Sequence, residues 1–575
     1  PEIPPNPELR PLSVSRFKRE PELIFPIRRR RRDHLSDGGA YPGDDKRLDL
    51  FRPDSPDCLG GVPVRLATIE KMPWFQTFTA VAVASVVLPP VGLILLWLRA
   101  TRLRWKLAGT LAIALLSFAH LYYFWGLRWE TDGTGIRPIF SFGDKETRAR
   151  VLEQSREAMR SDPPPAPVPT APDKVETKTP PLVPAAPAAA TDFWVDFRGP
   201  GRLGHYAEKP ILTNWPANGL QRLWKQPVGG GYASLVIGGG LAYTIEQRRD
   251  QEFVAAYDVA TGRERWTSSY PAHFSESMGG DGPRTTPVYD EGRLYSLGAE
   301  GEFRCLEART GKVIWRKNIL EENGASNLTW AQSSSPLIVD NKVIVLPGGP
   351  NGKSVVAYDK LTGSAIWSSQ NDEQSYTAPM LVTLNGKRQV LVVSALRVMG
   401  LDPENGALLW EYPWVTEYHI NASQPIVVGA NRFFISAGYG HGAALVELTP
   451  DGDKFQAKTV WQNNRMKNKF NSSVLYEGHV YGMDEAILAC IDVQTGAQKW
   501  KGGRYGYGQL LLAGSHLVVL TEQGEVVLVK ADPSSHQEIA RFSAIDGKTW
   551  NHPAIAGGIL FVRNTAEMAA FRIAQ

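Results

Sequence analysis

An eleven-residue phrase recurs along this 575-residue chain and limits its possible folds more than any other feature. Its copies read AYDVATGRERW, CLEARTGKVIW, AYDKLTGSAIW, GLDPENGALLW and CIDVQTGAQKW, and they end at Trp266, Trp315, Trp367, Trp410 and Trp500. Repetition at a regular spacing is typical of a fold built from one supersecondary unit that stacks on copies of itself. The chain is therefore predicted to form a closed or open array of such units.

Each part of the phrase has a mechanical role in a hairpin. An aspartate opens the turn, because its carboxylate accepts hydrogen bonds from the backbone N–H groups ahead of it. A glycine supplies the positive φ that a bulged hairpin needs, and the tryptophan that ends the next strand fills the gap to a neighbouring unit. The aspartates are Asp258, Asp359, Asp402 and Asp492, and the glycines are Gly262, Gly311, Gly363, Gly406 and Gly496.

Two further strand-like runs precede each phrase, which gives four strands per unit of roughly 40 to 50 residues, the period of a propeller blade. The sequence therefore predicts an all-β, eight-bladed β-propeller over residues 192–575. Only about three strands' worth of chain follows Phe542, so we expect the strand around Trp224 to complete the last blade and close the ring. The tryptophans expected to dock one blade on the next are Trp224, Trp266, Trp315, Trp367, Trp410, Trp461 and Trp500.

Two apolar stretches, residues 75–98 and 107–127, are each long enough to cross a bilayer and predict a two-helix transmembrane hairpin within residues 72–128. Pro89 and Pro90 are expected to kink the first helix. The loop between the stretches is rich in Arg and Lys, which places it in the cytoplasm by the positive-inside rule. The C-terminal bulk is then expected on the periplasmic side of the inner membrane. A cleaved signal peptide is disfavoured because a second stretch follows at once.

The segments that flank the hairpin are not expected to form a core. Residues 1–71 have no sustained period and are predicted to be a disordered tail. The first methionine is Met72, directly before the first apolar stretch, and we expect the native protein to start there, the preceding residues being upstream translation. Residues 129–191 contain a charged helix at 144–160 and then a Pro/Ala-rich linker.

Composition excludes several classes of protein. The net charge of +4 is unevenly placed, because residues 72–128 hold five Lys/Arg and no acid. The C-terminal bulk is consequently almost neutral, and no nucleic-acid partner is predicted. Three cysteines, Cys58, Cys305 and Cys490, cannot build a disulfide framework. The ten histidines are scattered without metal-ligand spacing, so no metal site is predicted.

The phrase A-x-D-x-x-T-G-x-x-x-W, repeated around a ring, resembles the pyrroloquinoline-quinone (PQQ)-type repeat propellers. The opening FRGPGRLGHY, residues 197–206, is similar to their membrane-anchored bacterial branch. This resemblance implies one of two functions. The first is a non-catalytic binding or assembly module, as in the propeller lipoprotein of the outer-membrane β-barrel assembly machinery. The second is a PQQ-dependent alcohol dehydrogenase that holds calcium with Glu, Asn and Asp.

The sequence favours the binding or assembly module, with no cofactor assigned. It has no Cys-Cys pair of the kind that the dehydrogenases often use, and no acidic run that supplies several oxygen ligands for calcium. The PQQ-dependent oxidoreductase with calcium is kept as the alternative, and glycan binding as a second one. Catalytic residues are not assigned.

The loops that join the outer strand of one blade to the inner strand of the next converge on one face of a propeller, near its axis. Here they are rich in aromatic and polar residues, a composition typical of a site for a small molecule, a glycan or a peptide. The alternative is that these residues close the channel mouth and satisfy the loop backbones. The residues predicted to form a ligand funnel are Tyr232, Glu246, Arg284, Trp330, Tyr376, Asn421, Lys467, Asn468, Tyr507 and Trp550.

Overall fold

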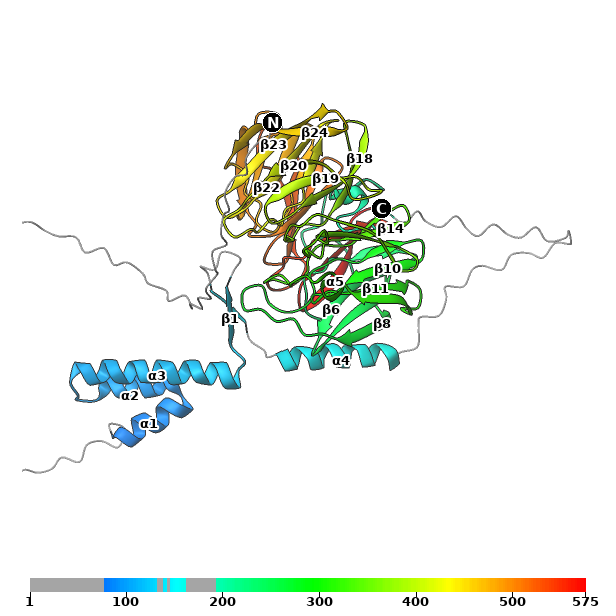
Figure 1. The fold of residues 1–575 in the computed structure, drawn as a ribbon. Helices are drawn as coiled ribbons and strands as arrows, with labels where there is room; N and C mark the ends of the chain where they lie inside the picture. The colour runs from blue at the N-terminus through cyan, green and yellow to red at the C-terminus, as the bar shows by residue number, and fades with distance from the viewer. Residues whose placement is uncertain (1–76, 132–137, 142–144, 162–192) are drawn as a thin grey trace, which may run out of the picture. The chain divides into compact units, whose positions relative to one another are not determined.

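The computed structural model describes residues 77–131, 138–141, 145–161 and 193–575 (Figure 1). The C-terminal part forms the predicted eight-bladed propeller of four-stranded blades, in which blades 1 to 6 are each an antiparallel sheet of four consecutive strands. The first strands of neighbouring blades contact one another, so they line the axis of the ring. The predicted tail, residues 1–71, and the predicted Pro/Ala linker lie outside the described residues.

The strands of blades 1 to 6 follow chain order. Blades 1 and 2 comprise β5 (Val236–Gly238), β6 (Leu241–Arg248), β7 (Gln251–Asp258) and β8 (Glu264–Pro271), then β9 (Val288–Asp290), β10 (Arg293–Leu297), β11 (Glu302–Glu307) and β12 (Val313–Asn318). Blades 3 and 4 comprise β13 (Leu337–Val339), β14 (Lys342–Val345), β15 (Val355–Asp359) and β16 (Ala365–Ser369), then β17 (Met380–Leu384), β18 (Lys387–Val393), β19 (Arg397–Leu401) and β20 (Leu408–Pro413). A short helix, α5 (Ile319–Asn323), follows blade 2.

The second half of the ring repeats this arrangement. Blades 5 and 6 comprise β21 (Ile426–Val428), β22 (Arg432–Ala437), β23 (Gly442–Asp451) and β24 (Lys454–Asn463), then β25 (Val474–Tyr476), β26 (His479–Asp484), β27 (Ile487–Asp492) and β28 (Gln498–Arg504). Blade 7 comprises β29 (Gln509–Ala513), β30 (His516–Leu520), β31 (Glu525–Lys530) and β32 (Glu538–Ser543), with β3 (His205–Tyr206) added as a fifth strand. Blade 8 comprises β33 (Ala554–Ala556), β34 (Ile559–Arg563), β35 (Glu567–Arg572) and β4 (Arg222–Pro227).

The ring closes as predicted, because β4, the strand that carries Trp224, is the outer strand of blade 8. It pairs antiparallel with β35, and Trp224 lies opposite Ala570. The closure joins segments at the two ends of the propeller sequence and leaves no open end to the array of blades. Blade 7 gains a further connection, because β3 pairs parallel with β29 through His205 opposite Leu512.

Burial of the strands follows their place in the blade. Middle strands are covered on both faces by neighbouring blades, so they are continuous apolar runs such as Val526–Val529 of β31, which are all buried. Outer strands are covered mainly on one face, and β12 accordingly alternates between half-buried and exposed residues. These two patterns explain why the third and fourth strands of each unit read so differently in the sequence.

The phrase forms the expected bulged hairpin between the third and fourth strands. In blade 3, Asp359 Oδ1 accepts hydrogen bonds from the backbone N–H of Leu361 at 3.0 Å and of Thr362 at 2.8 Å. Gly363 has φ 73°, in the region that favours glycine, and the strand register shifts between Ala357 and Tyr358. The Asp–Thr–Gly part of the phrase is thus a local turn device.

The tryptophans of the phrase join neighbouring blades through their indole N–H groups. Trp266 donates to the main-chain oxygen of Ala308 at 2.9 Å, and a Cβ on the turn glycine Gly311 would lie 2.3 Å from its ring. The glycine is therefore required by the neighbouring ring as well as by its φ. The other indoles that donate to a main-chain oxygen of the next blade are Trp224, Trp315, Trp367, Trp461 and Trp500.

The helical region differs from the predicted hairpin. The predicted first span is two ten-residue helices, α1 (Phe78–Val87) and α2 (Pro89–Leu98), broken at Leu88. Each extends about 15 Å, half of a hydrocarbon core of about 30 Å. Among the described residues one helix, α3 (Leu103–Phe124), is long and apolar enough to cross a membrane. The two-helix transmembrane hairpin is therefore not confirmed.

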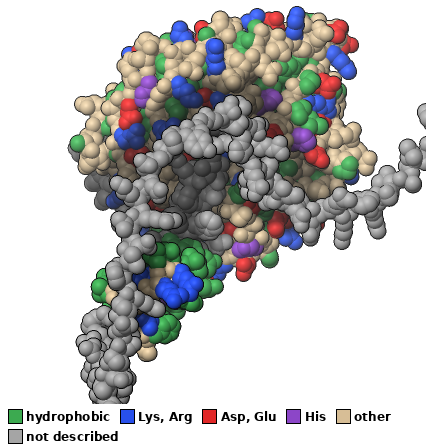
Figure 2. Space-filling view, turned by 90° about the vertical axis from the view of Figure 1, so that its left-hand side faces the viewer, with side chains coloured by type: hydrophobic (Ala, Val, Ile, Leu, Met, Phe, Trp, Pro, Cys, Tyr) green, Lys and Arg blue, Asp and Glu red, His purple; other side chains and the backbone are tan. Residues whose placement is uncertain are grey.

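The break has a local cause. Proline at the first two positions of α2 cannot continue the hydrogen bonding of α1. The two helices then pack closely, because the Cβ position of Gly92 lies 2.3 Å from Ser85 Oγ. Figure 2 shows the surface of the helical region as largely hydrophobic, with Lys and Arg side chains gathered on it. The segment after α3 contains β1 (Arg128–Thr131), β2 (Pro138–Ser141) and α4 (Lys145–Ser161).

Candidate functional site

Six of the predicted funnel residues lie in two adjoining sets of contacts on the loops that enter the inner strands. These are Tyr232, Arg284, Trp330, Tyr376, Tyr507 and Trp550, and the structure adds Phe470 from the loop before blade 6. We call these seven residues the loop-face cluster. They come from the loops before blades 1, 2, 3, 4, 6, 7 and 8, so nearly every blade contributes one member.

One side of the cluster is a set of packed rings that crosses the closure of the propeller. Tyr232, before blade 1, stacks on Trp550, before blade 8, with ring centroids 5.5 Å apart and an interplanar angle of 29°. Phe470 contacts Trp550 at 4.6 Å and Tyr507 at 5.2 Å. Stacked and tilted pairs at these distances contribute roughly 0.5–1.5 kcal/mol each beyond burial of area. The rings therefore hold one another in place.

The other side combines a cation with rings. The guanidinium of Arg284 lies 5.4 Å from the ring centroid of Tyr232 and 4.8 Å from that of Phe274. Gly279 brings the backbone close to both neighbours, because a Cβ there would lie 3.0 Å from Arg284 Nη2 and 3.4 Å from Trp330 Cδ1. Trp330 in turn contacts Tyr376 at 5.8 Å. The contacts thus continue from blade 1 to blade 4.

Two lysines that the sequence analysis did not select lie against the cluster. Lys469 Nζ is 5.0 Å from the ring centroid of Tyr507 and 4.8 Å from that of Tyr439. Lys548 Nζ is 4.5 Å from the ring of Trp550. Cations over aromatic faces are stabilised by the ring quadrupole. Both lysines lie in loops predicted to be polar and aromatic, and each is within two residues of a predicted funnel residue, Asn468 or Trp550, which was the available signal.

A buried acid fixes two members of the cluster. Glu522, which follows β30, is 6% exposed, and its Oε1 accepts a hydrogen bond from Trp550 Nε1 at 2.8 Å. Its Oε2 accepts one from the backbone N–H of Tyr507 at 3.3 Å. A carboxylate with two oxygens can orient both groups at once. Glu522 is therefore a positioning residue for this part of the cluster.

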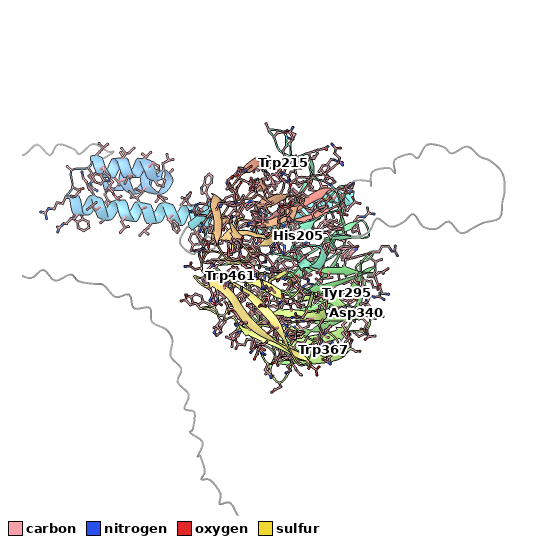
Figure 3. All side chains as sticks on the ribbon, turned by 90° about the horizontal axis from the view of Figure 1, so that it is seen from above. His205, Trp215, Tyr295, Asp340, Trp367 and Trp461 are labelled. Atoms are coloured by element: carbon pink, nitrogen blue, oxygen red, sulfur yellow. The ribbon has the colours of Figure 1, made fainter. Side chains whose placement is uncertain are left out.

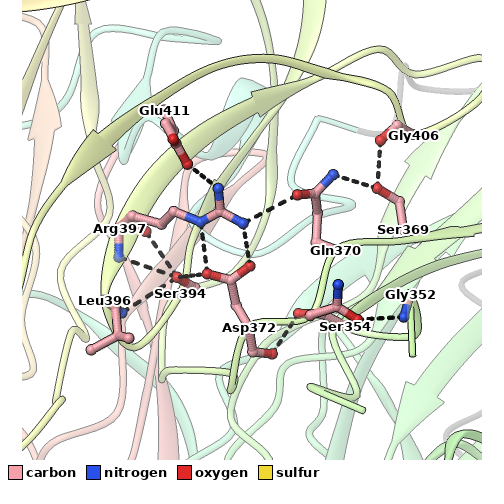
Figure 4. Close-up of polar contacts among 11 residues, drawn as sticks. Gly352, Ser354, Ser369, Gln370, Asp372, Ser394, Leu396, Arg397, Gly406 and Glu411 are labelled. Carbon is pink, nitrogen blue, oxygen red and sulfur yellow. Dashed lines mark hydrogen bonds and ion pairs between the residues drawn. The ribbon is translucent and has the colours of Figure 1, made fainter. Parts of the chain in front are cut away.

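An ion-paired network holds the loop that carries Tyr376 (Figure 4). Arg397 of β19 donates from Nε and Nη2 to the two carboxylate oxygens of Asp372, at 2.7 and 2.6 Å, and it also pairs with Glu411. These hydrogen bonds raise the pKa of Arg397 above its ordinary value, with Asp372 the largest cause. Ser354 donates to the main-chain oxygen of Asp372 at 2.7 Å, so the start of the loop is tied to blade 3 as well.

Two tyrosines on these loops, Tyr376 and Tyr439, stay neutral at ordinary pH. Burial raises the pKa of the Tyr376 hydroxyl to about 12, and burial likewise raises the pKa of Tyr439 to about 12. Burial also lowers the pKa of the Arg284 guanidinium from its usual range. The phenols therefore act as neutral hydrogen-bonding and stacking groups rather than as bases.

The remaining predicted residues have structural partners. Asn421 and Asn468 are buried, and their side-chain N–H groups donate to main-chain oxygens, for example of Ser394 and Met483 at 3.0 and 3.1 Å. Lys467 pairs with Asp484.

Glu246 lies within β6, and it is fully buried. It is ion-paired to Arg248 and accepts a hydrogen bond from the Tyr257 hydroxyl at 3.1 Å.

The axis beside the cluster carries a belt of hydrogen bonds between blades. The backbone N–H of Ser234 donates to Thr286 Oγ1 at 3.0 Å, and that of Thr286 donates to Ser335 Oγ at 2.9 Å. On the other side, the backbone N–H of Gln424 donates to Ser472 Oγ at 3.1 Å. Small hydroxyl residues thus recur where inner strands begin because they join one blade to the next.

The segment before β3 adds an arginine to this belt. Arg202, in a 3₁₀ turn η2 (Pro200–Arg202), is 1% exposed and donates from Nη1 to Ser335 O at 3.1 Å and to Pro379 O at 2.8 Å. These oxygens belong to the starts of blades 3 and 4. Asp196 balances the charge, with a distance of 2.8 Å from its Oδ1 to Arg202 Nη2. The N-terminal segment of the propeller therefore occupies the axis and joins two blades there.

The described residues contain no group of three or more His, Cys, Asp or Glu side chains that could hold a metal ion. Cys305 and Cys490 are buried, and burial raises the pKa of each thiol to about 12. They lie at equivalent positions of β11 and β27, each beside a buried tyrosine, Tyr295 and Tyr481. Both cysteines are therefore small residues of the blade cores.

Comparisons with known proteins identify proteins that are similar to the repeat region of this chain. Residues 249–502 match the family model described as Outer membrane protein assembly factor BamB. The chain is 23% identical over 363 residues to the Outer membrane protein assembly factor BamB of Burkholderia pseudomallei, which covers 55% of this chain and 90% of that protein. It is 28% identical over 152 residues to the Quinoprotein alcohol dehydrogenase PedH of Pseudomonas putida, which covers 24% of this chain and 25% of that protein.

Among solved structures, that of BamB from Moraxella catarrhalis aligns with a TM-score of 0.44 and 15% identity, over 62% of this chain and 98% of that one. The predicted resemblance to the PQQ-type repeat propellers is confirmed by the sequence matches. The relatives include both a protein named as an assembly factor and one named as a dehydrogenase.

Proposed function

We propose that this protein is a membrane-tethered, extracytoplasmic binding module, and that the loop-face cluster holds a segment of a protein partner. The observation that carries the proposal is the cluster itself, in which two tryptophans, three tyrosines and an arginine from different blades lie in two sets of contacts that adjoin at Gly279. Trp, Tyr and Arg are the residues most enriched among the hot spots of protein interfaces. Similarity to a protein named as an assembly factor supports a protein partner over a small molecule.

Photocrosslinking tests this proposal. A photoreactive phenylalanine analogue replaces Trp330 in the full-length protein in its own membrane, and a matched one replaces Tyr476, at the end of β25 and outside the cluster. We expect a discrete polypeptide adduct at position 330 and none at 476. Trp330→Ala and Trp550→Ala should each weaken binding of that polypeptide by about 30-fold, since truncating a hot spot costs about 2 kcal/mol or more. Equal labelling at both positions contradicts the proposal.

Glycan binding is a separate outcome of the same variants. Aromatic side chains also bind sugars through their faces, so the purified protein is applied to a glycan array. A glycan signal that disappears in both Trp330→Ala and Trp550→Ala assigns the cluster to polysaccharide. Trp215→Phe, at a ring that packs on Phe542 outside the cluster, is the control that should leave any binding unchanged.

We also propose placement at the inner membrane, which α3 and the charges at its N-terminal end support. Arg102, Arg104 and Lys106 lie at the N-terminal end of α3, so the positive-inside rule puts that end in the cytoplasm and the propeller in the periplasm. An alkaline phosphatase fusion after residue 128 should be active, and a fusion after residue 100 inactive. A third fusion, before α1, tests whether α1 and α2 together cross the membrane: activity there supports the two-span hairpin.

A PQQ-dependent dehydrogenase is the second candidate, favoured by the similarity to PedH. The planar rings of the loop-face cluster, with Arg284 and the two lysines that lie against it, suit a flat, anionic cofactor. The described residues do not fit the calcium that the resembled dehydrogenases hold, because no acidic set converges there. Adding PQQ and Ca²⁺ to the full-length protein tests this function directly: a raised melting temperature together with alcohol-dependent dye reduction would favour the dehydrogenase over the binding module.

A further inference from the structure

A small cavity lies between the N-terminal segment of the propeller and the inner strands of blades 5 and 6. Its volume is about 160 Å³. This is below the roughly 300 Å³ at which sites for drug-sized ligands begin, but it is about five times the roughly 30 Å³ that one water occupies. The residues that line it are Arg198, Arg202, Leu203, His205, Gln424, Pro425, Ile426, Val427, Ser473 and Leu475. Figure 3 labels His205 within the ring, with Trp367 and Trp461 nearer its outside.

Arg198 brings an unbalanced charge to this cavity. It is 1% exposed, and it donates from Nη2 to Ser473 O at 3.1 Å and to Leu203 O at 3.4 Å. Its Nε, buried, has no hydrogen-bond partner in the described part of the chain. No carboxylate of the described residues lies within ion-pair distance of it, whereas the neighbouring Arg202 has Asp196.

The surroundings of Arg198 supply no negative charge. Burial lowers its own pKa to about 9. Burial, together with the charge of Arg198, lowers the pKa of His205 to about 4 and that of His552 well below its usual range. Both imidazoles are therefore neutral near pH 7. A buried cation that is compensated only by carbonyl and imidazole dipoles carries a large desolvation penalty, which a bound anion would offset.

We propose that this cavity is a binding site for a small oxyanion, such as phosphate, sulfate or a carboxylate group, and that Arg198 is its charged contact. Arg198 and an apolar wall of Ile426, Val427 and Leu475 face the same space, so a charge-assisted hydrogen bond would form in a medium of low dielectric. The volume admits a tetrahedral anion or a carboxylate with one or two waters, and excludes a nucleotide-sized ligand. The site is separate from the loop-face cluster and does not depend on its ligand.

The site also has a structural consequence. Arg198 belongs to the same segment as Arg202, which joins blades 3 and 4, so an anion at Arg198 would hold that segment against blade 6 through Ser473. Binding to the folded state alone raises the melting temperature in proportion to the logarithm of the ligand concentration above its Kd. The anion would therefore stabilise the whole propeller.

Anion titrations of the full-length protein in detergent test the proposal. Sodium phosphate, sulfate and acetate are each exchanged for chloride at constant ionic strength, and both the melting temperature and the heat of binding are measured. We expect a saturable rise in melting temperature and a stoichiometry of one site. If phosphate and sulfate raise the melting temperature and acetate does not, the ligand is an inorganic oxyanion. If only acetate raises it, the ligand is a carboxylate group of a larger molecule. A response equal to that of chloride overturns the proposal.

Three variants locate the site. Arg198→Met should abolish the anion response. Val427→Phe fills the cavity while Arg198 is kept, and it should abolish the response too. Arg541→Met, at a surface arginine paired with Glu525 and Glu538, should respond as the unaltered protein does. A response that persists in Arg198→Met would show that Arg198 is not the charged contact. A response that persists in Val427→Phe would show that the anion does not bind in this cavity.

Discussion

The indole Nε1 of Trp410 donates to the side-chain oxygen of Gln389 at 2.6 Å, within its own blade 4. Other tryptophans donate to the next blade, at the residue that follows the turn aspartate or its equivalent, as Trp367 does to Pro403 O; these are Trp224, Trp266, Trp315, Trp367 and Trp461. Blade 5 has no Asp–Thr–Gly turn, since β23 and β24 run on to a tight turn at Gly452. Trp410 therefore meets a different neighbour, and its ring stacks on Phe433 of blade 5 at 5.1 Å instead.

Gln389→Leu should destabilise the protein by about 1–3 kcal/mol, the cost of leaving buried polar groups unpaired. Gln389 is fully buried, and its Nε2 also donates to Leu384 O at 3.1 Å, so the substitution orphans both the indole N–H and a carbonyl. The midpoint of urea unfolding measures the loss. Gln456→Leu, on the exposed outer strand β24, is the matched control and should change the midpoint little.

Two glycines of blade 2 distinguish the two reasons for glycine in a turn, which are a positive φ and the space taken by a neighbouring ring. Gly292 and Gly311 have φ of 78° and 75°, but a Cβ at Gly292 would meet nothing within 4 Å, whereas one at Gly311 would lie 2.3 Å from Trp266. Gly292→Ala should cost about 1 kcal/mol, from backbone strain alone. Gly311→Ala adds overpacking against the ring, of about 1–3 kcal/mol more. Similar melting temperatures for the two variants would show that the ring does not constrain this position.

The turn aspartate makes a pH-dependent contribution to stability. The backbone N–H of Thr362, followed by the Thr362 hydroxyl, lowers the pKa of Asp359 below its ordinary value of 3.8. A carboxyl whose pKa is lower in the folded state stabilises the protein above 3.8, and this stabilisation is lost as the pH falls through the folded-state pKa. The difference in melting temperature between the unaltered protein and Asp359→Asn should therefore be constant from pH 5 to 7 and shrink below 3.8. A difference that grows on acidification contradicts this.

Glu522 should control the geometry of the loop-face cluster. Glu522→Leu removes the acceptor for Trp550 Nε1 and for the backbone N–H of Tyr507, so Trp550 loses its fixed orientation. We expect the crosslinking yield at position 330 to fall several-fold and the tryptophan emission of the protein to shift. Glu522→Gln keeps an oxygen acceptor and should retain most of both signals. Equal loss in the two variants would indicate a general packing defect.

The repeat made the ring predictable, because most units repeat the same turn and a docking indole. Closure through Trp224 followed from counting strands. The loop positions of Tyr232, Arg284, Trp330 and Trp550 followed from the place of each loop within its unit.

Other parts had no periodic signal. Asn421 and Asn468 lie in the same polar and aromatic loops as the cluster residues, but their side chains donate to buried main-chain oxygens. Whether a loop residue joins the cluster or bonds the backbone depends on contacts between loops. The role of Arg202 depends on oxygens more than 130 residues away in the chain, which no local pattern reveals. The sequence predicts a kink at Pro89, but the same proline is compatible with a kinked helix and with a full break between α1 and α2.

Arg202 should contribute far more to the free energy of unfolding than an exposed arginine that is also paired with an aspartate. Arg202 is 1% exposed and pairs with Asp196, whereas Arg388 pairs with Asp340 at 3.0 Å with both side chains about half exposed. Breaking a buried pair typically costs about 3–5 kcal/mol, and breaking an exposed one about 0–1 kcal/mol. We therefore expect Arg202→Met to lower the melting temperature sharply and Arg388→Met to leave it almost unchanged.

The position of the damage makes this prediction specific. Arg202 Nη1 bonds the starts of blades 3 and 4, so its loss should speed backbone hydrogen exchange first in β13 and β17. Asp196→Asn keeps the arginine and its bonds to Ser335 O and Pro379 O, so exchange there should change less although stability also falls. Uniform acceleration around the ring in Arg202→Met would mean that this arginine supports the whole fold and does not join two particular blades.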